Sequence, residues 1–209
     1  MGEFLVNLFV KSADRDAVAE AVKPILRPAY EKAKTSRQMD ADAAALFVAP
    51  SIRGWVGVFD QLMEGQNEAL CEWTVRKLSG ALNTVAISFL LHDDDFVRYW
   101  LAREGRLLDR YHSVPDYFGP VATAELKRLQ GRPLLLANAC GRPMEALSLA
   151  RVLRDPDWSG LELLEEIDAL LEIPNLLQGY NTVENDAEEG WVEGWDSFRA
   201  ITLRELLGA

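Results

Sequence analysis

The sequence has few residues of the kinds that cross-link a chain or hold a metal ion. Its 209 residues include two cysteines, Cys71 and Cys140, and two histidines, His92 and His112. Two cysteines without a secretory signal are typical of reduced thiols in a cytoplasm, and we expect both to be small buried side chains. A chain of this length can bury a sizeable core without a disulfide or a metal. We therefore expect a cytoplasmic protein that requires no cofactor.

Long hydrophobic runs are also missing. The first apolar run, residues 4–10, is interrupted by Asn7 and is too short to span a bilayer, so no membrane association is predicted. Basic residues are scarce toward the C-terminus, where residues 113–209 contain 17 acidic and 8 basic residues, a net charge of −9 out of −11 for the chain. Because nucleic-acid affinity depends on Lys and Arg contacts to phosphate, this charge argues against a nucleic-acid partner.

The familiar catalytic signatures are absent. The sequence contains no Gly-x-Ser-x-Gly turn, phosphate-binding loop, dinucleotide fingerprint or HExxH pair. Cys140 precedes Gly141 at an expected helix end, where the negative end of the helix dipole raises a thiol pKa and opposes nucleophilic activation. These observations favour a protein without catalytic activity.

The pattern of apolar residues predicts an α+β fold built on an antiparallel sheet. Short apolar runs predict strands, and helical spacing with capping residues predicts the helices between them. The expected elements are a strand at 4–10, a helix from 14, strands at 46–49 and 55–59, a helix at 67–82, and strands at 84–91, 96–103 and 106–111. This β-α-β-β-α-β-β-β order begins like the split βαβ, or ferredoxin-like, arrangement, an inference from element order alone.

After residue 114 the pattern changes to helices. They are expected at 121–130, 134–139, 144–154, 161–171 and 201–207, with a strand at 178–184. Both faces of the predicted sheet are too apolar for water, so we expect these helices to cover one face, and a homodimer contact across the sheet is the alternative. The chain thus divides into an α+β module, residues 1–114, and a mainly helical acidic portion, residues 115–209, packed as one compact unit.

Residues 92–95 are expected to turn the central hairpin, because Asp side chains commonly bond the backbone amides of turns. With Asp93 and Asp94 as a two-residue turn, Leu91 pairs with Phe96. His92 and His112 then share a face of the sheet but lie on the order of 10 Å apart or more, too far to share a zinc ion. The turn is the preferred interpretation, and a metal site is the alternative. That alternative site comprises His92, Asp93, Asp94 and Asp95.

The most unusual stretch is 184–198, which has six acidic residues and no Lys or Arg, yet carries Trp191, Trp195 and Phe198. Aromatic residues among acids can anchor a basic or amphipathic partner. The competing interpretation is a loop whose tryptophans return to the core. The predicted binding residues are Glu188, Glu189, Trp191, Glu193, Trp195 and Asp196.

The sequence therefore predicts a non-catalytic binding or adaptor protein that engages a basic protein partner through its acidic C-terminal surface. One form of this hypothesis is an immunity-like protein that neutralises the partner. Two alternatives stay open. One is a metal-assisted hydrolase that uses His92 and the adjacent aspartates, and the other is a small-ligand sensor with a pocket between sheet and C-terminal helices and residues 32–42 as a lid.

Overall fold

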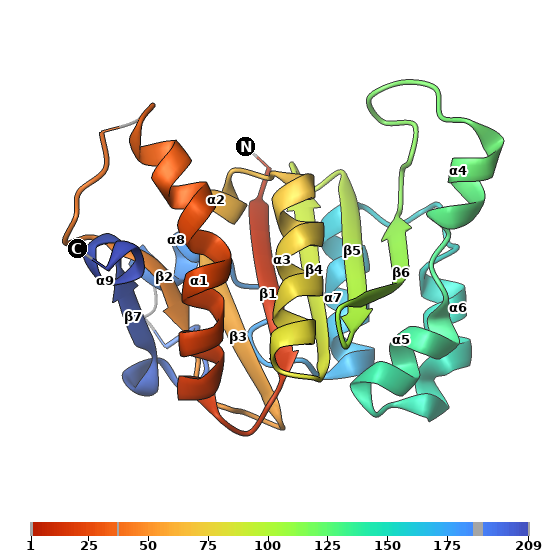
Figure 1. Cartoon of the computed structure of the whole chain (residues 1–209). Coiled ribbons are helices and arrows are strands. Elements are labelled where there is room, and N and C mark those ends of the chain that lie inside the picture. Colours follow the sequence, from red (N-terminus) through yellow and green to blue (C-terminus); the bar gives the residue numbers. More distant parts are fainter. Residues whose placement is uncertain (1, 37, 186–189, 209) are drawn as a thin grey trace.

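The protein is described by a computed structural model over residues 2–36, 38–185 and 190–208. This part of the chain forms a seven-stranded antiparallel sheet in the order β6-β5-β4-β1-β3-β2-β7, with helices on both sides (Figure 1). The predicted α+β class with an antiparallel sheet is confirmed. The strands are β1 (Phe4–Lys11), β2 (Ala44–Val48), β3 (Trp55–Asp60), β4 (Val85–His92), β5 (Phe96–Arg103), β6 (Arg106–His112) and β7 (Arg199–Thr202).

The first half of the chain has the split βαβ arrangement that its element order predicts. Helix α1 (Arg15–Lys34) leads from β1 to β2, and α3 (Glu68–Ala81) leads from β3 to β4, after the short helix α2 (Gln61–Glu64). The four strands lie in the order β4-β1-β3-β2, so each long helix crosses over a neighbouring strand. β5 and β6 then extend the sheet beyond β4 through two hairpins.

The second half is mainly helical, as expected, with one correction. The expected strand at 178–184 is wrong, because Tyr180 and Val183 are buried at helical spacing and the carboxylate of Glu64 accepts a hydrogen bond from the N–H of Asn181 at 3.4 Å. The helices are α4 (Thr123–Arg128), α5 (Pro133–Cys140), η1 (Pro143–Glu145), α6 (Ala146–Val152), α7 (Gly160–Leu171), α8 (Tyr180–Asn185), η3 (Trp195–Ser197) and α9 (Leu203–Leu207).

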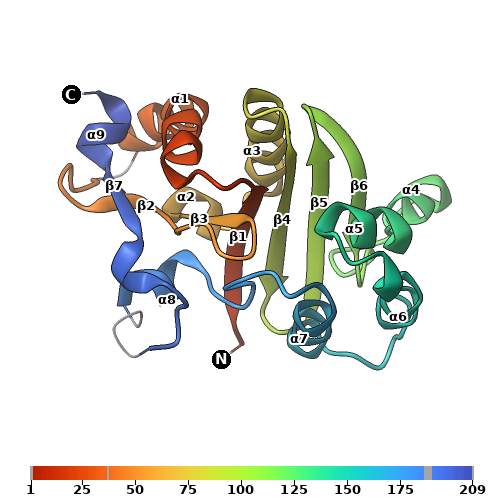
Figure 2. The ribbon, with the colours of Figure 1, turned by 90° about the horizontal axis from the view of Figure 1, so that it is seen from below.

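Helices cover both faces of the sheet, and a separate apolar core lies on each face. Figure 2 shows α1, α3 and α9 on one side of the strands and α5, α6, α7 and α8 on the other. The first core contains Val6 and Leu8 of β1, whereas the second contains Leu5 and Phe9, because successive side chains of a strand point to opposite faces. The expected covering of the second face by the C-terminal helices is confirmed.

The last strand was not expected from the sequence. Residues 201–207 are predicted to be a helix, but β7 occupies 199–202 and pairs with β2, and α9 begins only after Thr202, whose Oγ1 accepts from the N–H of Glu205 at 3.1 Å. The sheet therefore takes strands from both portions of the chain. Within the described residues, no helix has the length and apolar character needed to cross a membrane.

The register of the β4–β5 hairpin differs from the prediction by one residue. Asp93 and Asp94 adopt positive φ angles of 52° and 58°, and the N–H of Asp95 donates to the carbonyl of His92 at 2.8 Å, which closes the turn. Asp95 also belongs to the loop and has no cross-strand partner. His92 therefore pairs with Phe96, and the expected pairing of Phe96 with Leu91 is wrong. A shift of one residue moves every side chain of a strand to the other face. Phe96 therefore packs on the α1 and α3 side.

Candidate functional site

The side chain of His92 is held in one orientation at the end of β4. Its Nδ1 lies 2.5 Å from Oε1 of Gln66, and Nε2 of Gln66 donates to the carbonyl of Leu91 at 2.6 Å. Because the amide nitrogen of Gln66 is used in this second bond, its amide oxygen faces the imidazole ring, and Nδ1 of His92 is the donor. The Nε2 atom of His92 is then an acceptor when the ring is neutral. His92 is therefore a fixed support for the rings that pack on it.

Aromatic rings from separate segments pack around His92. Phe4, Tyr117 and Phe118 meet it edge-on at centroid distances of 5.1, 5.7 and 5.5 Å, and Phe96 stacks on it at 4.8 Å. These are favourable aromatic geometries. Phe96 is buried, but Phe4, Tyr117 and Phe118 are 44, 40 and 73 % exposed. Apolar ring surface thus faces solvent at this end of the sheet.

Hydrogen bonds tie three further segments to the same turn. The N–H of Glu3 donates to Oδ1 of Asp94 at 2.9 Å, and the hydroxyl of Tyr117 donates to Oδ2 of Asp95 at 2.6 Å. The N–H of Gly160, the first residue of α7, donates to the carbonyl of Asp94 at 2.6 Å. The turn is therefore the point at which the N-terminus, the loop after β6 and the start of α7 meet.

The segments that converge at this end of the molecule carry acids but no cations of their own. The converging segments, residues 2–10, 92–97, 113–122 and 155–169, contain no Lys or Arg. No ion pair in the described part of the chain involves an acid of the turn or of the loop after β6. We call this region the hairpin surface, which comprises Phe4, His92, Asp93, Asp94, Asp95, Asp116, Tyr117 and Phe118.

The alternative metal site gains no geometric support. The ring of Phe96 separates the two histidines, with centroids 4.8 Å from His92 and 4.5 Å from His112. The carboxylates of Asp94 and Asp95 already accept protein hydrogen bonds. Among the described residues, no three His, Cys, Asp or Glu side chains form a group that could hold a metal ion. The turn therefore lacks the convergent ligands that a metal site requires.

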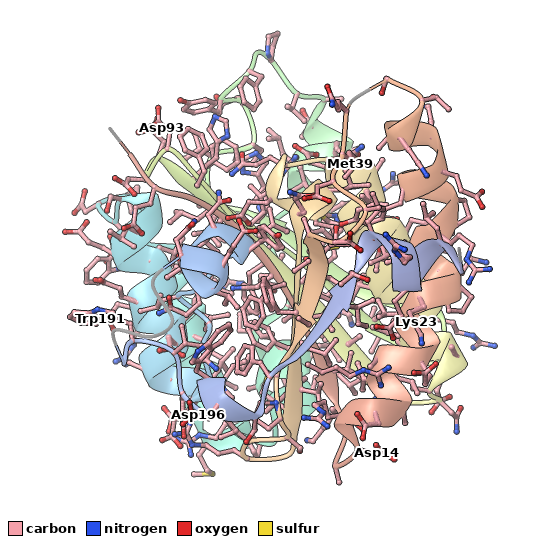
Figure 3. All side chains as sticks on the ribbon, turned by 90° about the vertical axis from the view of Figure 1, so that its left-hand side faces the viewer. Asp14, Lys23, Met39, Asp93, Trp191 and Asp196 are labelled. Atoms are coloured by element: carbon pink, nitrogen blue, oxygen red, sulfur yellow. The ribbon has the colours of Figure 1, made fainter. Side chains whose placement is uncertain are left out.

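Of the binding residues predicted in the C-terminal segment, some are exposed and others are not. Glu188 and Glu189 lie outside the described residues. Trp191 is 69 % exposed, and Asp196 is exposed, whereas Trp195 is half-buried against the ring of Phe47. Figure 3 shows Trp191 and Asp196 well below Asp93, so this segment and the hairpin surface occupy different parts of the molecule.

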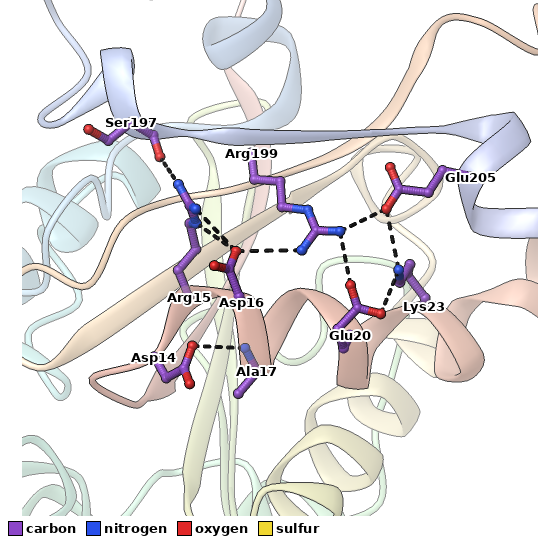
Figure 4. A network of polar contacts seen from close by, with 9 residues as sticks. All are labelled: Asp14, Arg15, Asp16, Ala17, Glu20, Lys23, Ser197, Arg199 and Glu205. Carbon is purple, nitrogen blue, oxygen red and sulfur yellow. Dashed lines mark hydrogen bonds and ion pairs between the residues drawn. The ribbon is translucent and has the colours of Figure 1, made fainter.

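Cations of the N-terminal half lie close to this C-terminal segment. Glu193 forms an ion pair with Arg53 at 3.0 Å. Arg15 of α1 donates to the carbonyl of Ser197 (Figure 4). Arg199, just after the segment, pairs instead with two acids of α1 and one of α9 at 2.8 to 3.5 Å, so it balances none of the segment's own acids. The acidic charge predicted for this surface is therefore partly neutralised by contacts that the sequence does not show, because their partners are far away along the chain.

One strongly perturbed carboxyl, that of Asp60, is enclosed. Asp60 is 1 % exposed, and burial raises its pKa to about 7. Its oxygens accept from the N–H of Met63 at 2.8 Å, capping α2, and lie 2.9 Å from the hydroxyl of Tyr30. Although perturbed pKa values often mark active sites, this group cannot meet a ligand. Its raised pKa instead makes the stability of the fold depend on pH.

Both cysteines are free thiols in the core. Burial raises the pKa of Cys71 and of Cys140 to about 12. Cys140 ends α5, and Gly141 follows in the left-handed conformation, as the sequence predicts. Neither thiol has the lowered pKa of a nucleophile.

Sequence reasoning missed Phe4, Tyr117 and Phe118. The loop 113–120 carries the same signal as the C-terminal segment, aromatic residues beside an acid and no Lys or Arg. What the sequence could not show is that this loop folds back onto a turn more than twenty residues earlier in the chain.

Comparisons with protein-family models, with curated proteins and with solved structures gave no match.

Proposed function

We propose that this chain is a non-catalytic binding protein that engages a basic segment of a protein partner, and that the hairpin surface makes the contact. The observation that carries the proposal is the combination of exposed aromatic rings with unpaired acids at one end of the sheet. Aromatic residues are enriched in protein interfaces, and complementary charge speeds and selects the encounter.

Charge complementarity argues for a basic partner. Asp93, Asp95 and Asp116 are exposed, and none of the ion pairs among the described residues involves them. A partner carrying Lys or Arg would supply the missing charge, and its cations could also lie over the ring faces at this site. By contrast, the described acids near the C-terminal segment include Glu193 and Glu205, which already have Arg or Lys partners.

Phe118 is the expected anchor of the contact. It is the most exposed ring of the hairpin surface, and its edge rests on His92 and Tyr117 at 5.5 and 4.8 Å. A ring that is supported on one side and open on the other loses little side-chain entropy on binding. Such pre-positioned aromatic residues are typical interface hot spots.

A peptide-binding experiment tests the proposal with two matched variants. A displayed random peptide library is selected on the wild-type protein, and the enriched peptides are expected to be net positive. One enriched peptide is then synthesised. The Phe118→Ser/Asp116→Asn variant should bind this peptide about tenfold more weakly than the wild type does, since it lacks one anchor ring and one charge. The Trp191→Ser/Asp196→Asn variant also removes one exposed ring and one exposed carboxylate, and it should change the affinity by less than about twofold.

The possible results separate the competing interpretations. Binding that survives high salt undiminished contradicts an electrostatic contact. Loss of peptide affinity in the Trp191→Ser/Asp196→Asn variant alone would assign the contact to the C-terminal surface instead. Equal loss in both variants, or enrichment of neutral peptides, removes the support for a specific basic partner. Self-association that Phe118→Ser abolishes would assign the hairpin surface to a second copy of the chain.

A further inference from the structure

A hollow of about 360 Å³ lies beside β6, and its lining is basic although the chain as a whole is acidic. Four cations line it: Arg110 of β6, Lys127 and Arg128 of α4, and Arg132 at the start of α5. The one lining carboxylate is Asp109. The hollow lies at residues 107–110 of β6, whereas the hairpin surface joins the far end of that strand after His112.

The cations of this hollow are incompletely neutralised. Within the described residues, Lys127 and Arg132 have no carboxylate at ion-pair distance. Arg110 and Arg128 share Glu125, at 3.8 and 3.4 Å, and Arg110 also contacts a glutamate of α3 at 3.2 Å. The hollow therefore keeps an excess of positive charge.

The lining carboxylate is engaged by the protein itself. Asp109 is buried and accepts hydrogen bonds from the hydroxyl of Tyr99 at 2.8 Å and from the backbone N–H of Arg132 at 2.6 Å. Burial raises the pKa of Asp109, whereas the hydrogen bonds from Tyr99 and Arg132 and the charge of Arg132 oppose that change. Asp109 thus positions the backbone of Arg132 at the edge of the hollow.

Gly131 lets the backbone come this close. Its φ is +67°, and a Cβ at this position would lie 2.6 Å from the hydroxyl oxygen of Tyr99 and 3.1 Å from the ring of Tyr111. Only glycine meets both requirements without strain. The basic wall formed by residues 127–132 is therefore held against β6 by specific geometry.

We propose that this hollow binds a small organic phosphate. A guanidinium group can donate two parallel N–H hydrogen bonds to the oxygens of one phosphate. Leu107 and Leu108 are half-buried in the lining and offer apolar contact to the organic part of the ligand. The volume falls at the lower end of the range for small-molecule pockets, roughly 300 to 1,000 Å³.

Calorimetric titration at low ionic strength tests this site with adenosine 5′-monophosphate, inorganic pyrophosphate and uncharged adenosine as probes. The Lys127→Gln/Arg132→Gln variant should lose about tenfold in affinity for the phosphate probes for each cation removed. The control is Lys34→Gln/Lys77→Gln, which removes two exposed cations from α1 and α3 and should change the affinity by less than about twofold. Adenosine should not bind.

Each contrary result overturns the proposal. The first is that neither phosphate probe binds the wild-type protein saturably. The second is that the two double variants lose the same affinity for the phosphate probes. The third is that adenosine binds as tightly as its monophosphate. If the double variant does not fold, the single change Lys127→Gln at an exposed position gives the same test. Because peptide binding at the hairpin surface uses other residues, either proposal can fail while the other holds.

Discussion

Replacing Asp60 by asparagine is expected to make folding less dependent on pH and to stabilise the protein relative to the wild type as pH rises. Asp60 is fully enclosed, and the hydroxyl of Tyr30 lies 2.9 Å from its carboxyl and 2.7 Å from the carbonyl of Ala45. A hydroxyl has one proton, so it can donate to only one of these oxygens. A protonated Asp60 supplies the second hydrogen bond, and the amide of asparagine can do the same.

The direction and size of this effect follow from the pKa. Burial raises the pKa of Asp60 from an ordinary 3.8 to about 7, although the N–H of Met63 and the hydroxyl of Tyr30 oppose the change. Because the folded pKa is above the unfolded value, this stabilising contribution is complete below the unfolded pKa and is lost as pH rises through the folded one. At ~1.4 kcal/mol per pKa unit, the wild type loses about 4 kcal/mol across this interval.

Urea unfolding of both proteins at a series of pH values measures the effect. The free energy of unfolding of Asp60→Asn minus that of the wild type should rise between the two pKa values and then level off. Asp196→Asn removes the same charge from an exposed position and should show no comparable rise. A difference that is constant with pH would show that folding does not change the pKa of Asp60, contrary to its burial.

Replacing Gly160 by alanine is expected to destabilise the protein by about 2 kcal/mol and to loosen the hairpin surface. A Cβ at position 160 would lie 2.6 Å from the backbone nitrogen of Phe96 and 2.9 Å from the carbonyl carbon of Asp95. Backbone atoms cannot move aside as a flexible side chain can, so the first turn of α7 must shift away. Such overpacking typically costs about 1 to 3 kcal/mol, and alanine's better helix propensity offsets at most about 1 kcal/mol.

Chemical unfolding gives the stability change, and the amide proton shift of residue 160 reports on its hydrogen bond to the carbonyl of Asp94. The control is Gly65→Ala, because Gly65 has a φ of −68° and a Cβ there would meet only the carbonyl oxygen of Leu62, at 3.3 Å. Equal, small effects of the two changes would mean that α7 is not seated on the turn as closely as the structure shows.

The turn at residues 92–95 shows how far local sequence carries a prediction. Three successive aspartates correctly predicted a turn, because Asp tolerates positive φ and bonds nearby amides. The register failed because turn chemistry does not reveal whether Asp95 pairs or is left over. That one residue decides which face Phe96 occupies, and hence that the ring separates the two histidines.

The acidic C-terminal segment also shows what local sequence can and cannot predict. The lack of Lys and Arg between residues 154 and 199 is visible in the sequence, but the pairing of Glu193 with Arg53 is not. Ion pairs between residues that are far apart in sequence depend on the packing of whole elements. A candidate surface chosen from local composition is therefore changed by cations that arrive from elsewhere in the fold.

The sequence by itself determined the class of fold, most of its strands and helices, and the scarcity of metal ligands and catalytic signatures, because capping, periodicity and composition are local properties. Only the tertiary structure decided which charges remain unpaired and which aromatic rings meet. It brought Phe4, His92, Tyr117 and Phe118 together at one end of the sheet, and gathered Lys127 and Arg132 beside β6. The physical reason is that both surfaces are made by segments distant in sequence, whose positions follow from strand order, register and helix packing.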